Sequence, residues 1–318
     1  MNFQIAFGLK NKHLQTIYAS LFRKTAPLEY KIERISLSDG DFLECFIYLT
    51  CKADAPYVML FHGLAGSYKS PYIQGIISAL HKEGFHVILM HFRGCSGKVN
   101  LLPRSYHSGD TQDAKECIAF IQKKYNPSKL YGVGYSLGAN MLLKLLGEMQ
   151  EESPFDKAVA ISAPMKLAIC ANQMNKGFSR YYQYRLIKEL KIALELKYKK
   201  FPMEKLLHVS LEDIRAIKTF WEFDAIYTAP IHGFSSAQEY YEKSSAFGYL
   251  HTIATPTLII HAKDDPFMTA EVIPTKHDVS KMVTLEITEG GGHVGFVGGS
   301  FLKPHYWLDE AIVSFFKD

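Results

Sequence analysis

The sequence predicts an α/β fold, with a mostly parallel central sheet, helices on both of its faces and a helical segment inserted late in the chain. Three observations support this prediction. Apolar runs alternate with helical patterns between Tyr57 and Ile161, which is typical of a parallel sheet. The alternation stops over residues 165–234, where the patterns are helical and irregular. Apolar runs suited to strands return at Thr257–His261 and Met282–Ile287.

We therefore expect two regions within the chain. Residues 1–164 and 235–318 should form the α/β core, and residues 165–234 should form a helical lid inserted into it. A chain of 318 residues is long for one compact domain, but α/β folds with an inserted lid reach this size.

The individual elements follow from the periodicity of apolar residues. A helix is expected at His13–Arg23, followed by a hairpin whose strands, Ile32–Leu37 and Phe42–Leu49, flank the turn Ser38-Asp39-Gly40-Asp41. Continuous apolar runs then predict strands covered on both faces, and amphipathic patterns predict helices. The further strands are expected at Tyr57–Phe61, Phe85–Met90, Lys129–Val133, Lys157–Ile161, Thr257–His261 and Met282–Ile287, and the further helices at Tyr72–Glu83, Thr111–Lys124, Asn140–Met149, Tyr181–Lys199, Leu211–Phe220 and Tyr306–Phe316.

Composition and charge are those of an ordinary globular protein, with 47% hydrophobic residues, 21% charged residues and a net charge of +4. The densest basic stretch, Arg180–Lys200, alternates with Tyr, Leu, Ile and Glu, as the solvated face of an amphipathic helix does. Because no nucleic-acid-binding motif accompanies it, no nucleic-acid partner is expected. No apolar run approaches the ~20 residues of a membrane span, which leaves peripheral contact with lipid open.

The cysteines and the N-terminal residues indicate a cytoplasmic protein. The five cysteines are odd in number and form no C-x-x-C pair, which argues against a disulfide framework and against a zinc site. Reduced, mostly buried thiols are typical of the cytosol. Lys10, Lys12 and His13 interrupt the apolar region that a signal peptide would need. We expect neither a metal nor a cofactor.

The segment Gly134-Tyr135-Ser136-Leu137-Gly138 is the most informative part of the sequence. It lies between the apolar run Lys129–Val133 and the helical pattern Asn140–Met149, so it joins a strand to a helix through a sharp turn. A serine hydroxyl is a weak nucleophile, and such a turn holds it clear of the backbone, beside a base and amide donors. In a chain with 22 glycines, one match can also arise by chance as a plain glycine-rich turn.

The same glycines invite comparison with a dinucleotide-binding loop, since Gly132, Gly134 and Gly138 occur in series. That motif requires two residues between its second and third glycines, and an acidic residue about 20 positions later at the end of the next strand. Here three residues intervene, and the next strand, Lys157–Ile161, ends in Ser162-Ala163-Pro164. The dinucleotide hypothesis fails on both counts.

If Ser136 is a nucleophile, a carboxylate and then a histidine should follow it at the ends of later strands. Asp264 and Asp265 directly follow the strand after the insertion, and His293 lies in the glycine-rich loop after the last strand. Either carboxylate could orient the histidine. Asp265 is favoured because it lies three residues past Ala262, the small residue that closes the strand, which leaves Asp264 as a turn carboxylate.

An ester carbonyl under attack needs backbone donors for its oxyanion. One expected donor is the amide of Leu137, directly after the nucleophile. The other is the amide of Leu64, in the His62-Gly63-Leu64 turn after the third strand. His62 should hold that turn in place, since His293 already fills the position of the base.

Two other motifs are interpreted as structural. Gly94-Cys95-Ser96-Gly97 offers a thiol and a hydroxyl after a strand, but it lacks the helix that a nucleophile turn needs, so Arg93–Gly97 is expected to border the site. Ser108 or Asp110 is expected near the N-cap of the helix that begins at Thr111.

Short segments spread through nearly the whole chain resemble a known family: Asn11–Thr16, His62–Leu64, Met90–Gly97, Tyr106–Thr111, Gly134–Asn140, Phe223-Asp224, Thr228–Pro230, Tyr240-Tyr241 and Asp264–Phe267. They are similar to the YheT-like branch of the α/β-hydrolases. The resemblance implies an α/β-hydrolase fold and a serine carboxylic-ester hydrolase with Ser136, Asp265 and His293 as its catalytic triad. It also implies a small-molecule ester or a lipid-like substrate.

The expected reaction is therefore hydrolysis of carboxylic esters through an acyl-enzyme on Ser136. The Tyr, Leu and Ile residues of the lid suggest an apolar acyl group of short to medium length. Two alternatives stay open at this point. The same triad can serve thioester or amide hydrolysis or acyl transfer to an alcohol, and the fold can serve as a non-catalytic binding module.

Overall fold

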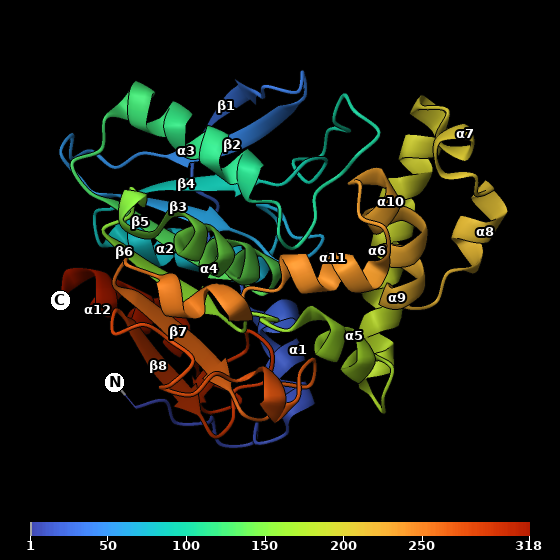
Figure 1. Cartoon of the computed structure of the whole chain (residues 1–318). Helices are drawn as coiled ribbons and strands as arrows, with labels where there is room; N and C mark the ends of the chain where they lie inside the picture. The colour runs from blue at the N-terminus through green and yellow to red at the C-terminus, as the bar shows by residue number, and fades with distance from the viewer. Residues whose placement is uncertain (1) are drawn as a thin grey trace.

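A computed structural model of the chain describes residues 2–318 and confirms the predicted fold class. Its centre is an eight-stranded sheet (Figure 1). The strands are β1 (Lys31–Ser36), β2 (Phe42–Tyr48), β3 (Tyr57–Phe61), β4 (His86–His91), β5 (Leu130–Tyr135), β6 (Lys157–Ile161), β7 (Thr257–Ala262) and β8 (Val283–Thr288). Their order across the sheet is β1-β2-β4-β3-β5-β6-β7-β8. Strand β2 is antiparallel to β1 and to β4, and every other neighbouring pair is parallel.

Helices cover both faces of this sheet (Figure 1). All residues of β3 are buried, and its alternate side chains join hydrophobic clusters on opposite faces. Helices α2 (Pro71–Lys82) and α12 (Trp307–Lys317) contribute to one cluster, and α3 (Thr111–Tyr125) and α4 (Leu137–Met149) contribute to the other. Burial on two faces explains why the central strands read as continuous apolar runs.

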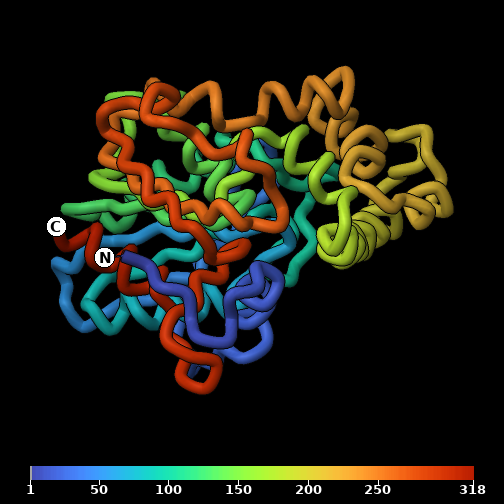
Figure 2. The backbone as a smooth tube through the Cα atoms, turned by 90° about the horizontal axis from the view of Figure 1, so that it is seen from below, coloured from blue at the N-terminus to red at the C-terminus, as the bar shows by residue number. Residues whose placement is uncertain are grey.

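The N-terminal segment and the region just before α12 lie side by side (Figure 2). Helix α1 (Lys12–Phe22) precedes the sheet and contacts α2. A small antiparallel sheet of β9 (Val297–Gly299) and β10 (Pro304–Tyr306) lies next to it, and the sequence pattern did not indicate these strands because each is only three residues long. The N-terminal chain joins this sheet through the Phe7 amide, which donates to the Gly299 carbonyl at 2.9 Å.

Between β6 and β7 the chain forms only helices. They are α5 (Leu167–Met174), α6 (Ser179–Lys200), α7 (Met203–Leu207), α8 (Leu211–Ala216), α9 (Phe220–Phe223), η2 (Asp224–Thr228), α10 (Ala229–Ile231), α11 (Ala237–Ser244) and η3 (Phe247–Thr252). Figure 1 shows α6 to α10 to one side of the sheet, and apolar side chains of α6 to α9 and η2 form a hydrophobic cluster of their own. None of the helices within residues 2–318 has both the length and the apolar composition needed to cross a bilayer.

The predicted single helix Leu211–Phe220 is wrong. Two helices are present instead, because α8 ends at Ala216 and α9 begins at Phe220. The Thr219 hydroxyl accepts the Glu222 amide N–H at 3.2 Å, and the Glu222 carboxylate accepts the Thr219 amide N–H at 3.1 Å. This capping box starts a new helix, although the spacing of apolar residues alone suggested that the first helix continued.

A buried ammonium group fastens α6 to the core. Lys197 donates to the Leu102 carbonyl at 2.7 Å, to the Arg104 carbonyl at 3.1 Å and to the side chain of Asn100. Burial lowers the pKa of Lys197 to about 8. The helical segment is thus attached to a core loop through side-chain contacts, in contrast to the backbone ladders that join the strands.

Candidate active site

Ser136 occupies a strained turn between β5 and α4. Its φ is +51°, a left-handed value that residues other than glycine rarely adopt. The flanking glycines are required by space, since a Cβ on Gly134 would lie 2.6 Å from the Ala139 Cα and one on Gly138 would lie 2.3 Å from the Phe61 carbonyl oxygen. These close approaches hold α4 against β3 and β5, and they fix the position of the Ser136 hydroxyl.

Three side chains from separate loops meet at this turn. The Ser136 hydroxyl lies 2.9 Å from Nε2 of His293, and Nδ1 of His293 lies 2.8 Å from Oδ2 of Asp265. Because an ionised carboxylate can only accept a hydrogen bond, Nδ1 carries the ring proton and Nε2 is left to accept from the hydroxyl. The three residues follow β5, β7 and β8, whose carboxyl ends share one edge of the sheet.

The neighbouring residues Asp264 and Asp265 have different surroundings. Burial alone would raise the pKa of Asp265, but the charge of His293 and the hydrogen bond with it outweigh burial and lower that pKa below its ordinary value. The Asp264 carboxylate instead accepts the Gly292 amide N–H at 2.9 Å, and burial raises its pKa. The structure places Asp265 against the imidazole and Asp264 under the turn of the histidine loop.

Three contacts that no sequence pattern indicated hold the His293 loop. The His293 amide donates to the Thr16 hydroxyl at 2.9 Å, and the Val294 amide donates to the Ser162 hydroxyl at 3.1 Å. The imidazole ring stacks on Phe267, with 4.0 Å between ring centroids and 11° between ring planes. These residues are far apart in the sequence, so only the fold brings them together.

Helix α1 supplies a further support through the buried side chain of Gln15. Its Oε1 accepts the Val297 amide N–H at 2.8 Å, and its Nε2 donates to the carbonyl oxygens of Leu9 and Val297 at 3.1 and 3.0 Å. With Thr16, this makes two adjacent residues of α1 that bind the chain on either side of the histidine loop. The N-terminal helix is therefore part of the structure that positions His293.

Leu64 and Leu137, whose amides are the predicted oxyanion donors, both line the cavity beside Ser136. Within residues 2–318, neither of these amides has a hydrogen-bond acceptor. The amides on either side of Leu64 are engaged by tyrosine hydroxyls, Gly63 with Tyr72 at 2.8 Å and Ala65 with Tyr106 at 2.9 Å. This arrangement leaves the two predicted donors available to a bound molecule.

His62 holds the loop that carries Leu64. It is completely buried, its Nε2 accepts the Phe92 amide N–H at 3.2 Å, and its Nδ1 lies 2.7 Å from the Gly63 carbonyl oxygen. Burial, together with the nearby His91, lowers the pKa of His62 to about 3. The ring is therefore neutral at physiological pH and is occupied by its loop contacts.

A cavity of about 390 Å³ opens beside Ser136 and His293. This volume is within the range of sites that take small organic molecules. Both the core loops and the inserted helices form its wall. The apolar residues that line it include Leu64, Leu137, Leu167, Met174, Leu186, Leu190, Leu194, Phe220, Phe223, Phe267 and Met268.

Arg93 and Cys95 also line the cavity, as expected for the loop that borders the site. Burial raises the pKa of the Cys95 thiol to about 12, so the thiol stays protonated and is a poor nucleophile. The Arg93 guanidinium is paired with Asp113 at 2.6 Å, with Asp39 at 2.8 Å and with Asp41 at 2.9 Å. Its charge is neutralised within the core and is not directed at the cavity.

A second buried carboxyl group lines the cavity from the inserted segment. Asp224 accepts a hydrogen bond from the Tyr241 hydroxyl at 2.7 Å. Burial raises the pKa of Asp224 to about 6, and hydrogen bonds from Thr228 and Tyr241 offset this effect only in part. Asp224 differs from Asp265 in having only neutral donors beside it.

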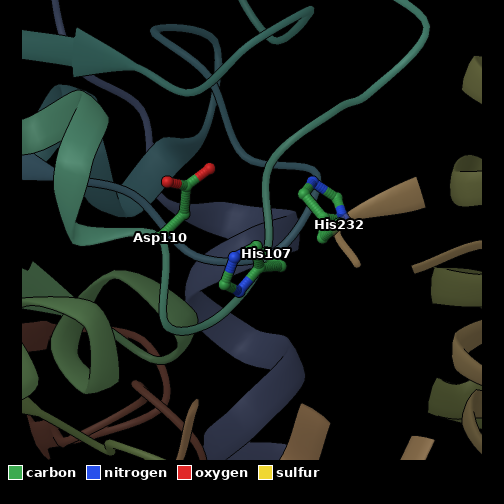
Figure 3. A group of neighbouring side chains, drawn as sticks. All are labelled: His107, Asp110 and His232. Atoms are coloured by element: carbon green, nitrogen blue, oxygen red, sulfur yellow. The ribbon is translucent and has the colours of Figure 1, made fainter. Parts of the chain in front are cut away.

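Among residues 2–318, one group of side chains has the types and spacing that could hold a metal ion. Ligand atoms of His107, Asp110 and His232 are within 4.8 Å of one another (Figure 3). The His232 ring is already placed between two backbone carbonyls, since Nδ1 lies 2.8 Å from the Thr228 oxygen and Nε2 lies 3.2 Å from the Ser105 oxygen. These contacts leave neither nitrogen of His232 free for a metal ion.

The surroundings of Asp110 also disfavour a bound cation. The Arg104 guanidinium lies 3.7 Å from its carboxylate, and Nδ1 of His107 accepts the Gly109 amide N–H at 3.2 Å. Burial, with repulsion from Asp113, raises the pKa of Asp110 to about 7. Asp110 occupies the N-cap position of α3, but its side chain makes no capping hydrogen bond. We interpret the group as a polar contact between the loop before α3 and the inserted segment.

Comparison with known proteins agrees with this fold. A family model described as the alpha/beta hydrolase fold matches residues 56–300. The Escherichia coli (strain K12) protein "Putative esterase YheT" is 43% identical over 308 residues, a region that covers 96% of this chain and 90% of that protein.

More distant relatives and structures extend the comparison. The "Monoacylglycerol lipase" of Saccharomyces cerevisiae (strain ATCC 204508 / S288c) is 28% identical over 271 residues, covering 82% of this chain and 59% of that protein. The esterase Pf2001 of Pyrococcus furiosus superposes with a TM-score of 0.60 over 100% of this chain and 97% of that one, and its 16% identity makes this a likeness of fold alone. The chain belongs to the YheT-like branch of the α/β-hydrolases, which are hydrolases of the esterase and lipase type.

Proposed function

We propose that this chain is a serine hydrolase that cleaves carboxylic esters through an acyl-enzyme on Ser136. The observation that carries the proposal is the continuous hydrogen-bonded series from Ser136 through His293 to Asp265, which ends beside an apolar cavity. A hydroxyl, an imidazole and a carboxylate in this order form a nucleophile, a base and the group that orients the base.

In the proposed acylation step, Ser136 Oγ attacks the ester carbonyl carbon while Nε2 of His293 takes its proton. The oxyanion of the tetrahedral intermediate accepts hydrogen bonds from the Leu64 and Leu137 amides, at the positive N-terminal end of α4. His293 then gives the proton to the leaving alkoxide as the carbon–oxygen bond breaks. The alcohol departs, and the acyl group stays on Ser136.

Deacylation repeats these transfers with water. His293 takes a proton from water as the water oxygen attacks the acyl carbon, and it returns that proton to Ser136 Oγ when the carboxylic acid leaves. Asp265 remains ionised throughout, since its lowered pKa keeps it a carboxylate beside the imidazolium. No step requires a cofactor.

We propose an apolar acyl group of short to medium length as the part of the substrate that occupies the cavity. Leu186, Leu190 and Leu194 of α6 contribute to its wall, and residues 165–234 are proposed to act as a lid over it. The relative named as a monoacylglycerol lipase is compatible with a lipid-like ester. A cytoplasmic location is also proposed, and the five unpaired cysteine thiols support it.

A fluorophosphonate probe, which reacts with activated serines, tests the nucleophile. The wild type should be labelled, and Ser136→Ala should lose both the label and about a millionfold in turnover of p-nitrophenyl esters. Ser96→Ala, in the loop that borders the site, is the matched control and should keep both. An unlabelled wild type, or a label that persists in Ser136→Ala, would contradict the proposal.

Three substrates that carry the same acyl group, an ester, a thioester and an amide, test which reaction the protein catalyses. Matched ester, thioester and amide substrates should be cleaved fastest as the ester, and added alcohol should not divert the product from the free acid. Esters of increasing acyl length should show kcat/KM rising while the chain still fits the cavity and falling once it does not. A preference for the thioester, or an ester product formed from the added alcohol, would replace hydrolysis by one of the related reactions.

A further inference from the structure

Two segments from opposite ends of the chain form one protruding surface, which we call the α1 surface: Phe7, Leu21, Phe22, Phe301 and Leu302. The Phe301 amide donates to the Phe7 carbonyl at 3.1 Å, and the rings of Phe22 and Phe301 are 6.2 Å apart. Figure 2 shows the loop around residue 300, in red, projecting beside the blue N-terminal segment. The five side chains therefore lie close together although their positions differ by almost 300 residues.

These side chains are unusually exposed for their type. Leu302 is 87% exposed, Phe7 82%, Leu21 64% and Phe22 55%. A single exposed apolar residue is common on protein surfaces, but a contiguous group of large ones marks a contact site for protein or membrane. Helix α1 already packs against the core through Tyr18 and Ala19, which are buried. The packing of the helix therefore does not account for the exposed side chains of Leu21 and Phe22.

The two stretches of chain that form the α1 surface carry basic side chains and no acidic ones. The sequence has no Asp or Glu from Met1 to Leu28, and none from Gly290 to Leu308. Over the same stretches Lys10, Lys12, Lys24 and Lys303 are exposed. In the helix that follows the second stretch, Asp309 is paired with Arg23 and Glu310 lies 2.7 Å from His305.

We propose that the α1 surface docks on an anionic lipid bilayer. Apolar side chains at the tip of a loop and a helix end, with lysines around them, match the two attractions that hold peripheral proteins at membranes, apolar insertion and binding to acidic headgroups. A second copy of the chain is a poorer partner, because a two-fold contact would bring each patch against itself. The lysines of one copy would then face the lysines of the other copy.

Docking at this surface would bring the proposed site close to the lipid. Thr16, which binds the His293 amide, precedes Phe22 by six residues on α1, a distance of about 9 Å along a helix. Docking itself does not depend on the proposed esterase activity. Only the purpose of docking, which is to take an ester directly from the membrane, rests on the proposed function.

Sedimentation of the full-length protein with vesicles tests the proposal. Vesicles of phosphatidylcholine with phosphatidylglycerol should bind the wild type, pure phosphatidylcholine vesicles should bind it more weakly, and added salt should weaken the binding to the anionic vesicles. Phe7→Ser combined with Leu302→Ser should reduce partitioning at least tenfold. Lys24→Gln and Lys303→Gln should each reduce it about fivefold.

Leu206→Ser is the matched control, because Leu206 on α7 is 48% exposed and lies outside the α1 surface. It should leave binding unchanged, and all variants should unfold at the wild-type temperature. The proposal is overturned if the wild type does not bind anionic vesicles, or if Leu206→Ser weakens binding as much as the paired substitution. A dimer in sedimentation velocity that Leu302→Ser dissociates would also overturn it in favour of self-association. Fluorophosphonate labelling is measured without vesicles, so the two proposals can fail separately.

Discussion

The strand-end site and the inserted helical segment each bury a carboxyl group near the same cavity, and the pKa values of the two groups are shifted in opposite directions. Burial favours the neutral form of both. At Asp265 the adjacent His293 outweighs burial and lowers the pKa, whereas at Asp224 only hydroxyl donors are present and the pKa rises to about 6. The pKa of a buried carboxyl group therefore depends more on the groups beside it than on how deeply it is buried.

The two regions also differ in how their parts are held. The strand-end residues are fixed through their own backbone, by the close approach of Gly138 to the Phe61 carbonyl and by the His293 amide, which donates to the Thr16 hydroxyl. The inserted segment is attached through side chains, including those of Lys197 and Tyr227, which donate to the Leu102 and Pro103 carbonyls of the loop before α3. We infer that the strand-end region supplies fixed geometry, and that the inserted segment supplies a cavity wall that can change with less effect on the fold.

The largest expected effect separates the two neighbouring aspartates of the strand-end region. Asp265→Asn should lower kcat by about ten-thousandfold, because an amide cannot hold the His293 tautomer in which Nε2 accepts a proton. Asp264→Asn, which alters a carboxylate bound to the Gly292 amide, should lower kcat less than tenfold. Steady-state kinetics on a p-nitrophenyl ester measures both. The opposite ranking would assign the orienting role to Asp264.

The next effect tests the claim that backbone packing fixes the site. Gly138→Ala should lower the free energy of unfolding by about 3 kcal/mol, because the new Cβ has no room against two backbone carbonyls. Gly248→Ala is the matched control, since a Cβ there meets nothing within 4 Å, and it should change stability by less than about 0.5 kcal/mol. Urea denaturation measures both values. Equal effects of the two substitutions would contradict the claim.

The last effect concerns the inserted segment and depends on pH. The folded protein keeps the Asp224 proton up to about pH 6, whereas an unfolded chain releases it near the ordinary value of 3.8. Between these values the folded state binds more protons, so stability falls as pH rises, by up to about 3 kcal/mol for this group. Relative to Asp224→Asn, the wild type should lose stability from about pH 4 to about pH 6 and then stay level.

Urea denaturation of both proteins across this pH range gives the measurement. Asp54→Asn, a change at an exposed carboxyl, serves as the control for general effects of removing a negative charge. If the difference between the wild type and Asp224→Asn does not vary with pH, or grows as pH rises, the contrast between the two buried carboxyl groups is wrong.

The sequence predicted the sheet and the order of the site residues because both leave local patterns. Burial on two faces gives continuous apolar strands, and the G-x-S-x-G turn must join a strand to a helix. The choice of Asp265 over Asp264 came from counting residues past Ala262, and the contact of Asp265 with His293 agrees with that choice.

The contacts that hold the His293 loop could not be predicted, because they join residues that are far apart in the sequence. Thr16, Ser162 and Phe267 support the His293 loop from three different elements, and no local sequence pattern shows that these residues contact that loop. The break between α8 and α9 is a different case. The Thr219 and Glu222 capping box was present in the sequence, and the apolar spacing on both sides of it obscured it.

The supports on α1 lie outside the region that the general fold model matches, although the Asn11–Thr16 segment itself resembles the YheT-like branch. The family match begins at residue 56, and it includes Ser136, Asp265 and His293. Gln15 and Thr16 lie outside it. A fragment that begins at Pro56 would keep every residue of the proposed chemistry and lose two of the contacts that hold the histidine loop. Such a fragment should therefore hold His293 less firmly than the whole chain does.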